Sequence, residues 1–439
     1  MRLATAPRTR RVANRQIRGA TLGQSPLRRH HAGMHVVLVE PAFPKNQREF
    51  LRGLLSTGAR VSAISERPPE ALPSELREGL FQFERVRSVV DEHAMAEAVK
   101  RLSMKARVDR LEATVEAHVM AAAHVREQLK IYGTTSRTAW LCRDKPAMKE
   151  AVRKAGLPCA ASARVTSFAD AEAFAKQTGY PLILKPLDGA GASGTSKVTN
   201  DAELKQACTT LKVDQGRTVA IEEFLEGHEG FYDTLSVAGK PVLDFACHYY
   251  PNVLEAMRTR WISPQIVCSN RVDSDSYQEL RTLGAKVIEA LGIWTSPTHM
   301  EWFASPKGLK FSEIGCRPPG VGVWDLYSAA NDIDLYAAWA HAIVHEKVPF
   351  KTSRKYSAGM IALRPDRDGV ISHYEGFDQI QRRFGEWILD SHLPQPGTAT
   401  QGVEGGYMAN AYVRMRHPDY DTLRSMLTTV GETVKVKAR

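Results

Sequence analysis

The chain has 439 residues, of which 43% are hydrophobic and 25% charged, and its formal net charge is +10 at pH 7. This length allows about two to four domains with a sizeable core, in the composition of an ordinary soluble α/β protein. No apolar run approaches the length of a membrane span, so a soluble protein without a membrane partner is expected. The six cysteines lack Cys-x-x-Cys spacing, which favours reduced thiols in a cytoplasmic protein over a disulfide framework or a structural metal.

Most of the positive charge lies at the N-terminus. Residues 1–33 contain eight arginines and no acidic residue, and removing these eight charges from the total of +10 leaves +2 for the rest of the chain. Such a segment resembles a transit peptide in composition, but a nucleic-acid-binding arm, a disordered tail or a translation start assigned too early would look the same. We favour the last two, because Met34 begins what looks like the first strand of a folded domain. A nucleic-acid partner is therefore not favoured, and nucleic-acid association through residues 1–33 stays open as a third alternative.

An alternation of strands and helices follows and predicts a doubly wound, mostly parallel sheet over residues 34–133. Pro41 and Pro44 stand after the first strand, where a phosphate-binding turn would need Gly-x-Gly-x-x-Gly. This Rossmann-like domain is therefore expected to have an architectural role. The predicted elements are strands at 36–39 and 60–65, a helix at 46–55, and a third strand at 107–112 followed by a long helix through Leu129.

Two lysines come from separate segments in the next part of the chain. A charged linker helix is predicted over residues 134–156 and contains Lys145, which alone would be read as a solvated surface lysine. The apolar run between Pro181 and Pro186 predicts a strand that ends at Lys185. Two such lysines can neutralise the α- and β-phosphates of one ATP molecule.

A glycine-rich loop follows Lys185. Its backbone N–H groups can surround phosphate oxygens, because glycine tolerates positive φ angles and close approach. The loop is not a Walker A motif, since Thr195 and not lysine follows Gly194, and no long helix opens behind it. A second strand at 196–198 and a helix at 202–211, capped by Asn200 or Asp201, are predicted instead. Alone, such a loop is more often a surface hairpin; here it is expected to cover a nucleotide.

A strand beginning at Thr218 leads into the extended connection Glu222–Leu225, and Glu229 follows. The backbone of such a connection can hydrogen-bond the edge of an adenine ring, and a later acid can hold ribose hydroxyls. A charged strand end without a ligand is the alternative interpretation.

Two alternating strands flank Pro306-Lys307-Gly308, a triplet typical of a three-residue hairpin loop. If Ser305 pairs with Leu309, Glu301 lies directly opposite Glu313 on one face of the hairpin. Directly opposed Cβ atoms are about 4.5 to 5.5 Å apart, so the two like charges repel unless a cation lies between them. Magnesium bound to a triphosphate is the expected occupant, because it takes one or two carboxylates and completes its shell with phosphate and water.

Arg317 stands four residues beyond Glu313, where its guanidinium could bind a carboxylate or the transferred phosphoryl group in a bidentate manner. Helices are predicted within residues 320–344. From Lys351 onward the chain predicts strands at 358–363 and 407–414 and a helix at 420–430.

Taken together, these motifs resemble the ATP-grasp superfamily in order and approximate spacing, from Met34 to the C-terminus. The chain is most similar to the branch with biotin carboxylase, the formate-dependent phosphoribosylglycinamide formyltransferase and the amino-acid and carnosine-type dipeptide ligases. The resemblance implies an α/β protein in which two α+β subdomains clasp ATP after the Rossmann-like domain. The implied divisions are a basic disordered leader at 1–33, the N-terminal domain at 34–133, an A subdomain at 134–217, a B subdomain at 218–350 and a small C-terminal lobe at 351–439.

The resemblance also implies roles for individual residues. Glu301 and Glu313 would ligate Mg2+, with Mn2+ as an alternative, and Arg317 and Lys185 would be catalytic. Many relatives have asparagine where this chain has Gly315. This departure favours the amine-ligase branch over biotin carboxylase and leaves the coordination of a second metal open. The expected ATP contacts are Lys145, Lys185, Gly189, Gly191, Ser193, Gly194, Thr195, Glu222, Glu223, Leu225 and Glu229.

The expected activity is that of an ATP-dependent ligase. It would activate a small carboxylate as an acyl-phosphate for attack by an amine, so both substrates are small molecules. Two alternatives remain open: a carboxylase- or formyltransferase-like enzyme with the same ATP site, and an ATP-binding protein without catalysis. A homodimer is a common arrangement in the family.

Overall fold

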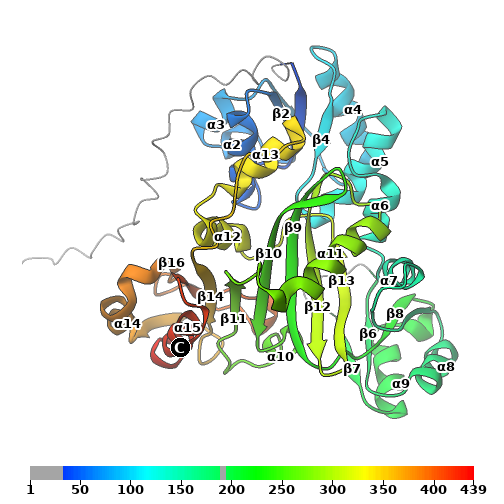
Figure 1. Ribbon diagram of the computed structural model, residues 1–439, viewed down its shortest axis with the longest axis vertical. Helices are drawn as coiled ribbons and strands as arrows, with labels where there is room; N and C mark the ends of the chain where they lie inside the picture. The colour runs from blue at the N-terminus through cyan, green and yellow to red at the C-terminus, as the bar shows by residue number, and fades with distance from the viewer. Residues whose placement is uncertain (1–32, 188–193) are drawn as a thin grey trace, which may run out of the picture.

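The computed structural model describes residues 33–187 and 194–439, and the strands of these ranges form four sheets. Figure 1 shows the N-terminal domain in blue and cyan at one end of a central sheet in green and yellow. A small lobe that contains α8 and α9 lies on one side of this sheet, and the C-terminal segment in orange and red lies on the other. No described helix is both long and apolar enough to cross a bilayer. All six cysteines are free thiols, as predicted.

The N-terminal domain contains the predicted parallel sheet, in the strand order β3-β2-β1-β4. The strand that ends at Glu112 is its fourth and not its third, so that part of the prediction was wrong. The missed strand, Gln82–Arg85, lies at the sheet edge and is only half buried, so its sequence lacks an apolar alternation. The elements are β1 His35–Val39, α2 Gln47–Ser56, β2 Arg60–Ser65, α3 Ser74–Glu78, β3 Gln82–Arg85, α4 Glu92–Ser103, β4 Arg110–Glu112 and α5 Val119–Leu129.

The single linker helix predicted over residues 134–156 is two helices, α6 Ser136–Leu141 and α7 Lys145–Lys154. Each has its own N-cap. The Thr135 side chain accepts a hydrogen bond from the backbone N–H of Thr138, and the Asp144 side chain accepts one from Ala147. Because Asp144 ends one segment and starts the next, Lys145 becomes the first residue of α7.

The small lobe is an antiparallel sheet in the order β5-β8-β6-β7. Its apolar core includes residues of α8 and α9, and Asn200 caps α9 as predicted. The strands β6 and β7 pair on either side of the glycine-rich loop. The elements are β5 Ser162–Val165, α8 Phe168–Thr178, β6 Leu182–Lys185, β7 Ser196–Val198, α9 Asp201–Thr210 and β8 Val219–Glu223.

The central sheet is antiparallel, in the order β13-β12-β9-β10-β11-β14-β17-β16. Its last three strands come from the C-terminal segment, so this segment extends the sheet. The strand predicted at 407–414 begins four residues later, at Ala411. The elements up to residue 345 are β9 His228–Val237, β10 Lys240–Tyr250, α10 Val253–Ala256, β11 Gln265–Ser269, α11 Gln278–Ala290, β12 Ser296–Ser305, β13 Gly308–Gly315, α12 Val323–Asn331 and α13 Leu335–His345. The later elements are β14 Ser357–Leu363, β15 Ile371–Glu375, α14 Phe377–Phe384, β16 Ile388–His392, β17 Ala411–His417, α15 Tyr420–Thr433 and β18 Lys435–Ala438.

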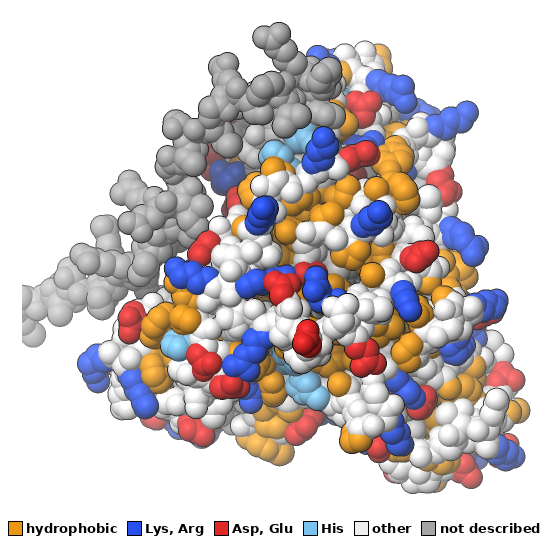
Figure 2. Space-filling view, in the orientation of Figure 1, with side chains coloured by type: hydrophobic (Ala, Val, Ile, Leu, Met, Phe, Trp, Pro, Cys, Tyr) orange, Lys and Arg blue, Asp and Glu red, His pale blue; other side chains and the backbone are white. Residues whose placement is uncertain are grey.

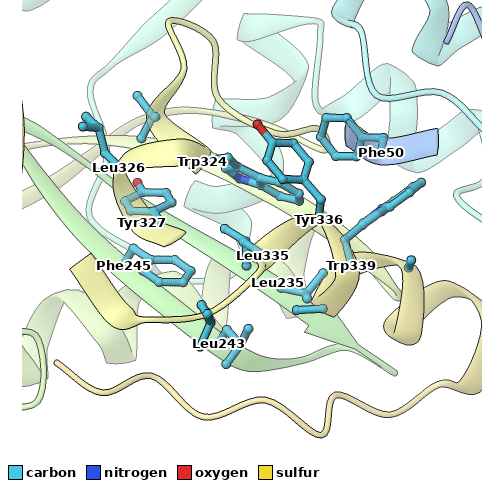
Figure 3. Close-up of a cluster of buried hydrophobic side chains, with 14 of the residues drawn as sticks. Phe50, Leu235, Leu243, Phe245, Trp324, Leu326, Tyr327, Leu335, Tyr336 and Trp339 are labelled. Carbon is cyan, nitrogen blue, oxygen red and sulfur yellow. The ribbon is translucent and has the colours of Figure 1, made fainter. Parts of the chain in front are cut away.

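An aromatic cluster joins the N-terminal domain to the central sheet (Figure 3). The Phe50 ring of α2 lies 4.9 Å from Trp324, 4.8 Å from Tyr336 and 5.0 Å from Trp339, measured between ring centres. Leu235 of β9 belongs to the same core. Buried aromatic side chains contribute large apolar areas, so this cluster fixes the N-terminal domain against the sheet that carries the site.

Candidate active site

A cavity of about 390 Å³ lies between the small lobe and the central sheet. It brings together residues from α7, β6, β8, β9, β12 and β13, which are far apart in sequence. The predicted site residues that line it are Lys145, Lys185, Thr195, Glu222, Glu223, Leu225, Glu229, Glu301 and Glu313. Gly189, Gly191 and Ser193 lie outside the described residues. Gly194 is described, has φ +68° and packs against Pro186, but it is not part of the lining.

The two acids predicted to share a face do so: Glu301 of β12 pairs directly with Glu313 of β13. The predicted turn, however, was wrong by one residue, because Ser305 pairs with Gly308 and not with Leu309. A bulge between Trp302 and Glu301 adds one residue to β13 and restores the predicted pairing at the acids.

The two carboxylates have very different pKa values. Burial, with the added effect of the Glu313 and Glu229 carboxylates, raises the pKa of Glu301 to about 8. Burial acts in the same direction on Glu313, but lysines led by Lys185 and Lys145 lower its pKa to about 2. Two opposed carboxylates that share one site cannot both ionise at low cost, because their negative charges repel each other. The site therefore favours a cation between them.

The donor set fits magnesium. A hard divalent cation takes one or two protein carboxylates and fills its remaining positions with phosphate oxygens and water. Within residues 33–187 and 194–439, no group of three or more His, Cys, Asp or Glu side chains is arranged to hold a metal. Glu301 and Glu313 form a pair, which is within the one or two carboxylates that Mg2+ takes when phosphate oxygens and water supply its other ligands. Gly315 supplies no side-chain ligand.

Lysines from the facing elements approach the same acid. The Nζ atoms of Lys185 and Lys145 lie 3.5 and 3.8 Å from Glu313 Oε2. Lys185 also contacts Glu222, at 2.8 Å. Burial lowers the pKa of Lys185, but Glu222 and Glu313 outweigh burial and raise it above its ordinary value. Both predicted lysines therefore lie within 4 Å of the Glu313 carboxylate.

Lys149 is a site residue that the sequence analysis missed. It lies one turn after Lys145 on α7, is fully buried, and places its Nζ 2.6 Å from Glu222 Oε1. Burial lowers its pKa to about 8, although the Glu222 carboxylate acts in the opposite direction. The sequence did contain a signal for Lys149, because Met148, Lys149 and Val152 share the buried face of α7. A lysine among apolar residues on one face of a helix is expected to be buried, whereas most lysines are solvated.

Glu229, predicted to hold ribose, is buried against α10. Its Oε2 accepts a hydrogen bond of 2.7 Å from the backbone N–H of Val253, and Asn252 Oδ1 accepts one from the Glu229 N–H. Burial raises the pKa of Glu229 to about 7, partly offset by the Val253 N–H. Arg258, in the same segment, donates to the Thr195 carbonyl at 2.8 Å. Residues 252–258 therefore form one wall of the cavity and contact the end of the glycine-rich loop.

Arg317 lies in a smaller recess that shares Lys145 and Glu313 with the main cavity. Its Nε lies 2.8 Å from Glu116 Oε2, so the N-terminal domain supplies a partner that the sequence did not reveal. A Cβ atom at Gly315 would lie 3.4 Å from Arg317 Nε, which is ordinary contact. Arg317 thus shares a recess with Glu313 and forms an ion pair with Glu116.

Comparison with known proteins finds that the model of the ATP-grasp domain matches residues 150–332. The L-arginine-specific L-amino acid ligase of Bacillus subtilis is 25% identical over 293 residues, which are 65% of this chain and 69% of that protein. The crystal structure of L-amino acid ligase from Bacillus licheniformis has a TM-score of 0.73 at 15% identity and covers 92% of this chain and 99% of its own. The biotin carboxylase domain of the Hydrogenobacter thermophilus 2-oxoglutarate carboxylase, solved with MgADP and bicarbonate, has a TM-score of 0.61 at 18% identity, with 91% and 90% coverage.

Proposed function

The chain belongs to the ATP-grasp superfamily, and from this premise we propose that it is an ATP-dependent ligase that joins a small carboxylic acid to an amine. One observation carries the proposal. The opposed carboxylates of Glu301 and Glu313 share a cavity with Lys145 and Lys185 from the facing elements. Such a site brings a divalent cation and two positive side chains to one triphosphate.

Lys145 and Lys185 would contact the phosphates of ATP, and the glycine-rich loop would cover them. Glu301 and Glu313 would hold Mg2+, which when bound would offset the charge of the phosphate oxygens. The backbone of Glu223 and Leu225 would contact adenine. The Glu222 carboxylate would not, because it already forms ion pairs with two lysines. Glu229 would bind ribose hydroxyls.

The reaction needs no protein nucleophile. A carboxylate oxygen of the acid attacks the γ-phosphorus of ATP, the bond to the β-phosphate oxygen breaks, and ADP and an acyl-phosphate result. The amine nitrogen then attacks the acyl carbon, phosphate leaves, and the nitrogen releases a proton. Lys145, Lys185 and Arg317 would orient the reactants and stabilise negative charge, which is the main demand of phosphoryl transfer.

Two features support small-molecule substrates in a reducing compartment. The six free thiols are typical of a cytoplasmic protein. On the face shown in Figure 2, Lys and Arg side chains are interspersed with Asp and Glu, where a nucleic-acid surface would gather positive charge. The free thiols favour a cytoplasmic enzyme, and the mixed charge on this face favours small-molecule substrates over a nucleic acid.

A substrate screen tests the proposal. The full chain is incubated with ATP, Mg2+ and pairs drawn from amino acids and small carboxylic acids, and ADP, phosphate and the product mass are measured. The proposal predicts that ADP release requires both an acid and an amine and yields an amide. ADP release that requires bicarbonate or formate would instead support a carboxylase- or formyltransferase-like reaction. ATP binding without ADP release from any pair would support a non-catalytic protein.

A further inference from the structure

A chain of alternating charges runs through the site. Lys149 Nζ lies 2.6 Å from one oxygen of Glu222, and Lys185 Nζ lies 2.8 Å from the other. Lys185 in turn approaches Glu313 at 3.5 Å, and Glu313 approaches Lys145 at 3.8 Å. Glu222 therefore has two cationic partners, and only one of them, Lys185, also reaches the carboxylate pair.

The two partners of Glu222 differ in their surroundings. The Lys149 side chain is 1% exposed, whereas that of Lys185 is 13% exposed and that of Glu313 26% exposed. Lys149 lies on α7 next to Met148, whose Sδ accepts a hydrogen bond from the Ile314 N–H of β13. This contact holds α7 against β13. Both lysines line the cavity, but Lys149 is almost completely buried, so it is the inner partner of Glu222 and Lys185 is the more exposed one.

This difference matters when a triphosphate enters. Phosphate oxygens compete with Glu222 for the ammonium group of Lys185. A buried carboxylate that loses its cation is costly, so Glu222 would hold Lys185 back if it had no other partner. With Lys149 in place, Glu222 keeps one ion pair while Lys185 turns toward the phosphates.

We propose that Lys149 is a positioning residue: it is the permanent counter-ion of Glu222 and thereby frees Lys185 to bind the phosphates of ATP. It acts through Glu222 and Lys185 and does not itself contact the nucleotide. This inference rests on the proposed function, because it assumes that ATP occupies the cavity.

A double-variant cycle tests the inference. Binding of ATP with Mg2+ is measured by isothermal titration calorimetry for the wild type, Lys149→Met, Glu222→Gln and Lys149→Met/Glu222→Gln, with thermal melting in parallel. We expect Lys149→Met to weaken ATP binding at least tenfold and the double variant to return to within about threefold of the wild type. The control is Lys154→Met, which removes an exposed lysine from the same helix and should leave binding unchanged.

Each other outcome overturns the inference in a recognisable way. A double variant as weak as Lys149→Met would mean that Lys149 contacts the phosphates directly. Unchanged affinity with a lower melting temperature would mean a purely structural role. If Lys149→Met does not fold, the double variant, in which no unpaired buried charge remains, still decides between these cases. Failure of the wild type to bind ATP would contradict the proposed function itself.

Discussion

Glu301 of β12 lies directly across from Glu313 of β13, and a bulge one residue away sets this register. Without the extra residue of the bulge, the hairpin would place Glu301 opposite Ser312 and turn Glu313 to the other face. The bulge therefore brings the two carboxylates together beside Lys185. Bulges next to active sites commonly aim a side chain in this way.

Glu313→Gln should abolish ATP-dependent turnover and leave the protein folded. The substitution keeps the shape of the side chain but removes the negative charge that faces Lys145, Lys185 and a cation. A loss of about 100-fold or more in ADP release is expected, in line with the removal of one strong electrostatic contact from an active site. ADP release measures the loss of turnover, and circular dichroism checks that the protein is folded. Glu150→Gln, on the exposed face of α7, is the control. Normal turnover in Glu313→Gln would refute the assignment.

Gly53→Ala should weaken the packing of the N-terminal domain on α13. A Cβ atom at Gly53 would lie 2.6 Å from the backbone oxygen of Tyr336, so one of the two helices must shift. The free energy of unfolding should fall by about 1 to 3 kcal/mol, the usual cost of overpacking. Urea denaturation measures the loss. Gly320→Ala meets open space and should have little effect; equal stability of the two variants would contradict the described contact.

Arg414→Met should destabilise the join between the C-terminal segment and α12. The Arg414 side chain is 13% exposed and binds Asp390 and Asp325. Its loss leaves two acids without their shared cation, at a cost of about 2 to 3 kcal/mol, below that for a fully buried pair because both acids are partly exposed. Arg271→Met breaks an exposed pair with Asp421 and should cost less than about 1 kcal/mol. Urea denaturation measures the free energy of unfolding of both variants. A comparable decrease in Arg414→Met and Arg271→Met would contradict the expectation that burial of the arginine determines the cost of removing it.

His248 should make the protein less stable in acid. Burial, with His228 and Arg424 acting in the same direction, lowers its pKa to about 3. Its ring nitrogens are 2.8 Å from His228 Nε2 and 2.7 Å from the Tyr277 hydroxyl. Between pH 6.5 and 3 the unfolded chain binds a proton that the folded protein refuses, so this histidine lowers the free energy of unfolding by up to about 1.4 kcal/mol per pH unit as the pH falls.

The test compares pH slopes of stability. By urea denaturation, the free energy of unfolding of His248→Gln should fall less between pH 7 and pH 5 than that of the wild type. The reason is that the variant lacks the histidine that takes up a proton on unfolding. His373→Gln removes an exposed histidine and should leave the slope unchanged. Parallel slopes for the wild type and His248→Gln would contradict a buried neutral imidazole.

The parts of the fold that depend on local pattern were predictable. The parallel N-terminal strands and the cap of α9 by Asn200 follow from short-range spacing. The facing pair Glu301 and Glu313 was predicted correctly only because the bulge offset the error in the turn. The order of the central sheet was not, because β14 lies beside β11 only through contacts across about ninety residues of chain. The hairpin turn was missed by one residue because no sequence feature marked the bulge that compensates for it.

The site shows the same division. Nine of the residues predicted from the resemblance line one cavity, Arg317 lies in the adjoining recess, and the roles of all of them remain predictions. The ion pair of Arg317 with Glu116 could not be predicted from the sequence, because Glu116 belongs to the N-terminal domain. Only the packing of that domain against the central sheet brings the two side chains together. Lys149 could have been found as a lysine on the apolar face of α7, but its pairing with Glu222 requires the small lobe to be in place.

Calorimetric titration with ATP, in Mg2+ and in EDTA, of the wild type and of Glu301→Gln/Glu313→Gln tests the metal site most directly. We expect the wild type to bind ATP at least tenfold more tightly with Mg2+ and the double variant to lose this difference. Equal affinity of the wild type with and without Mg2+, or a magnesium effect that survives in the double variant, would contradict the claim that the opposed glutamates hold the metal against the triphosphate.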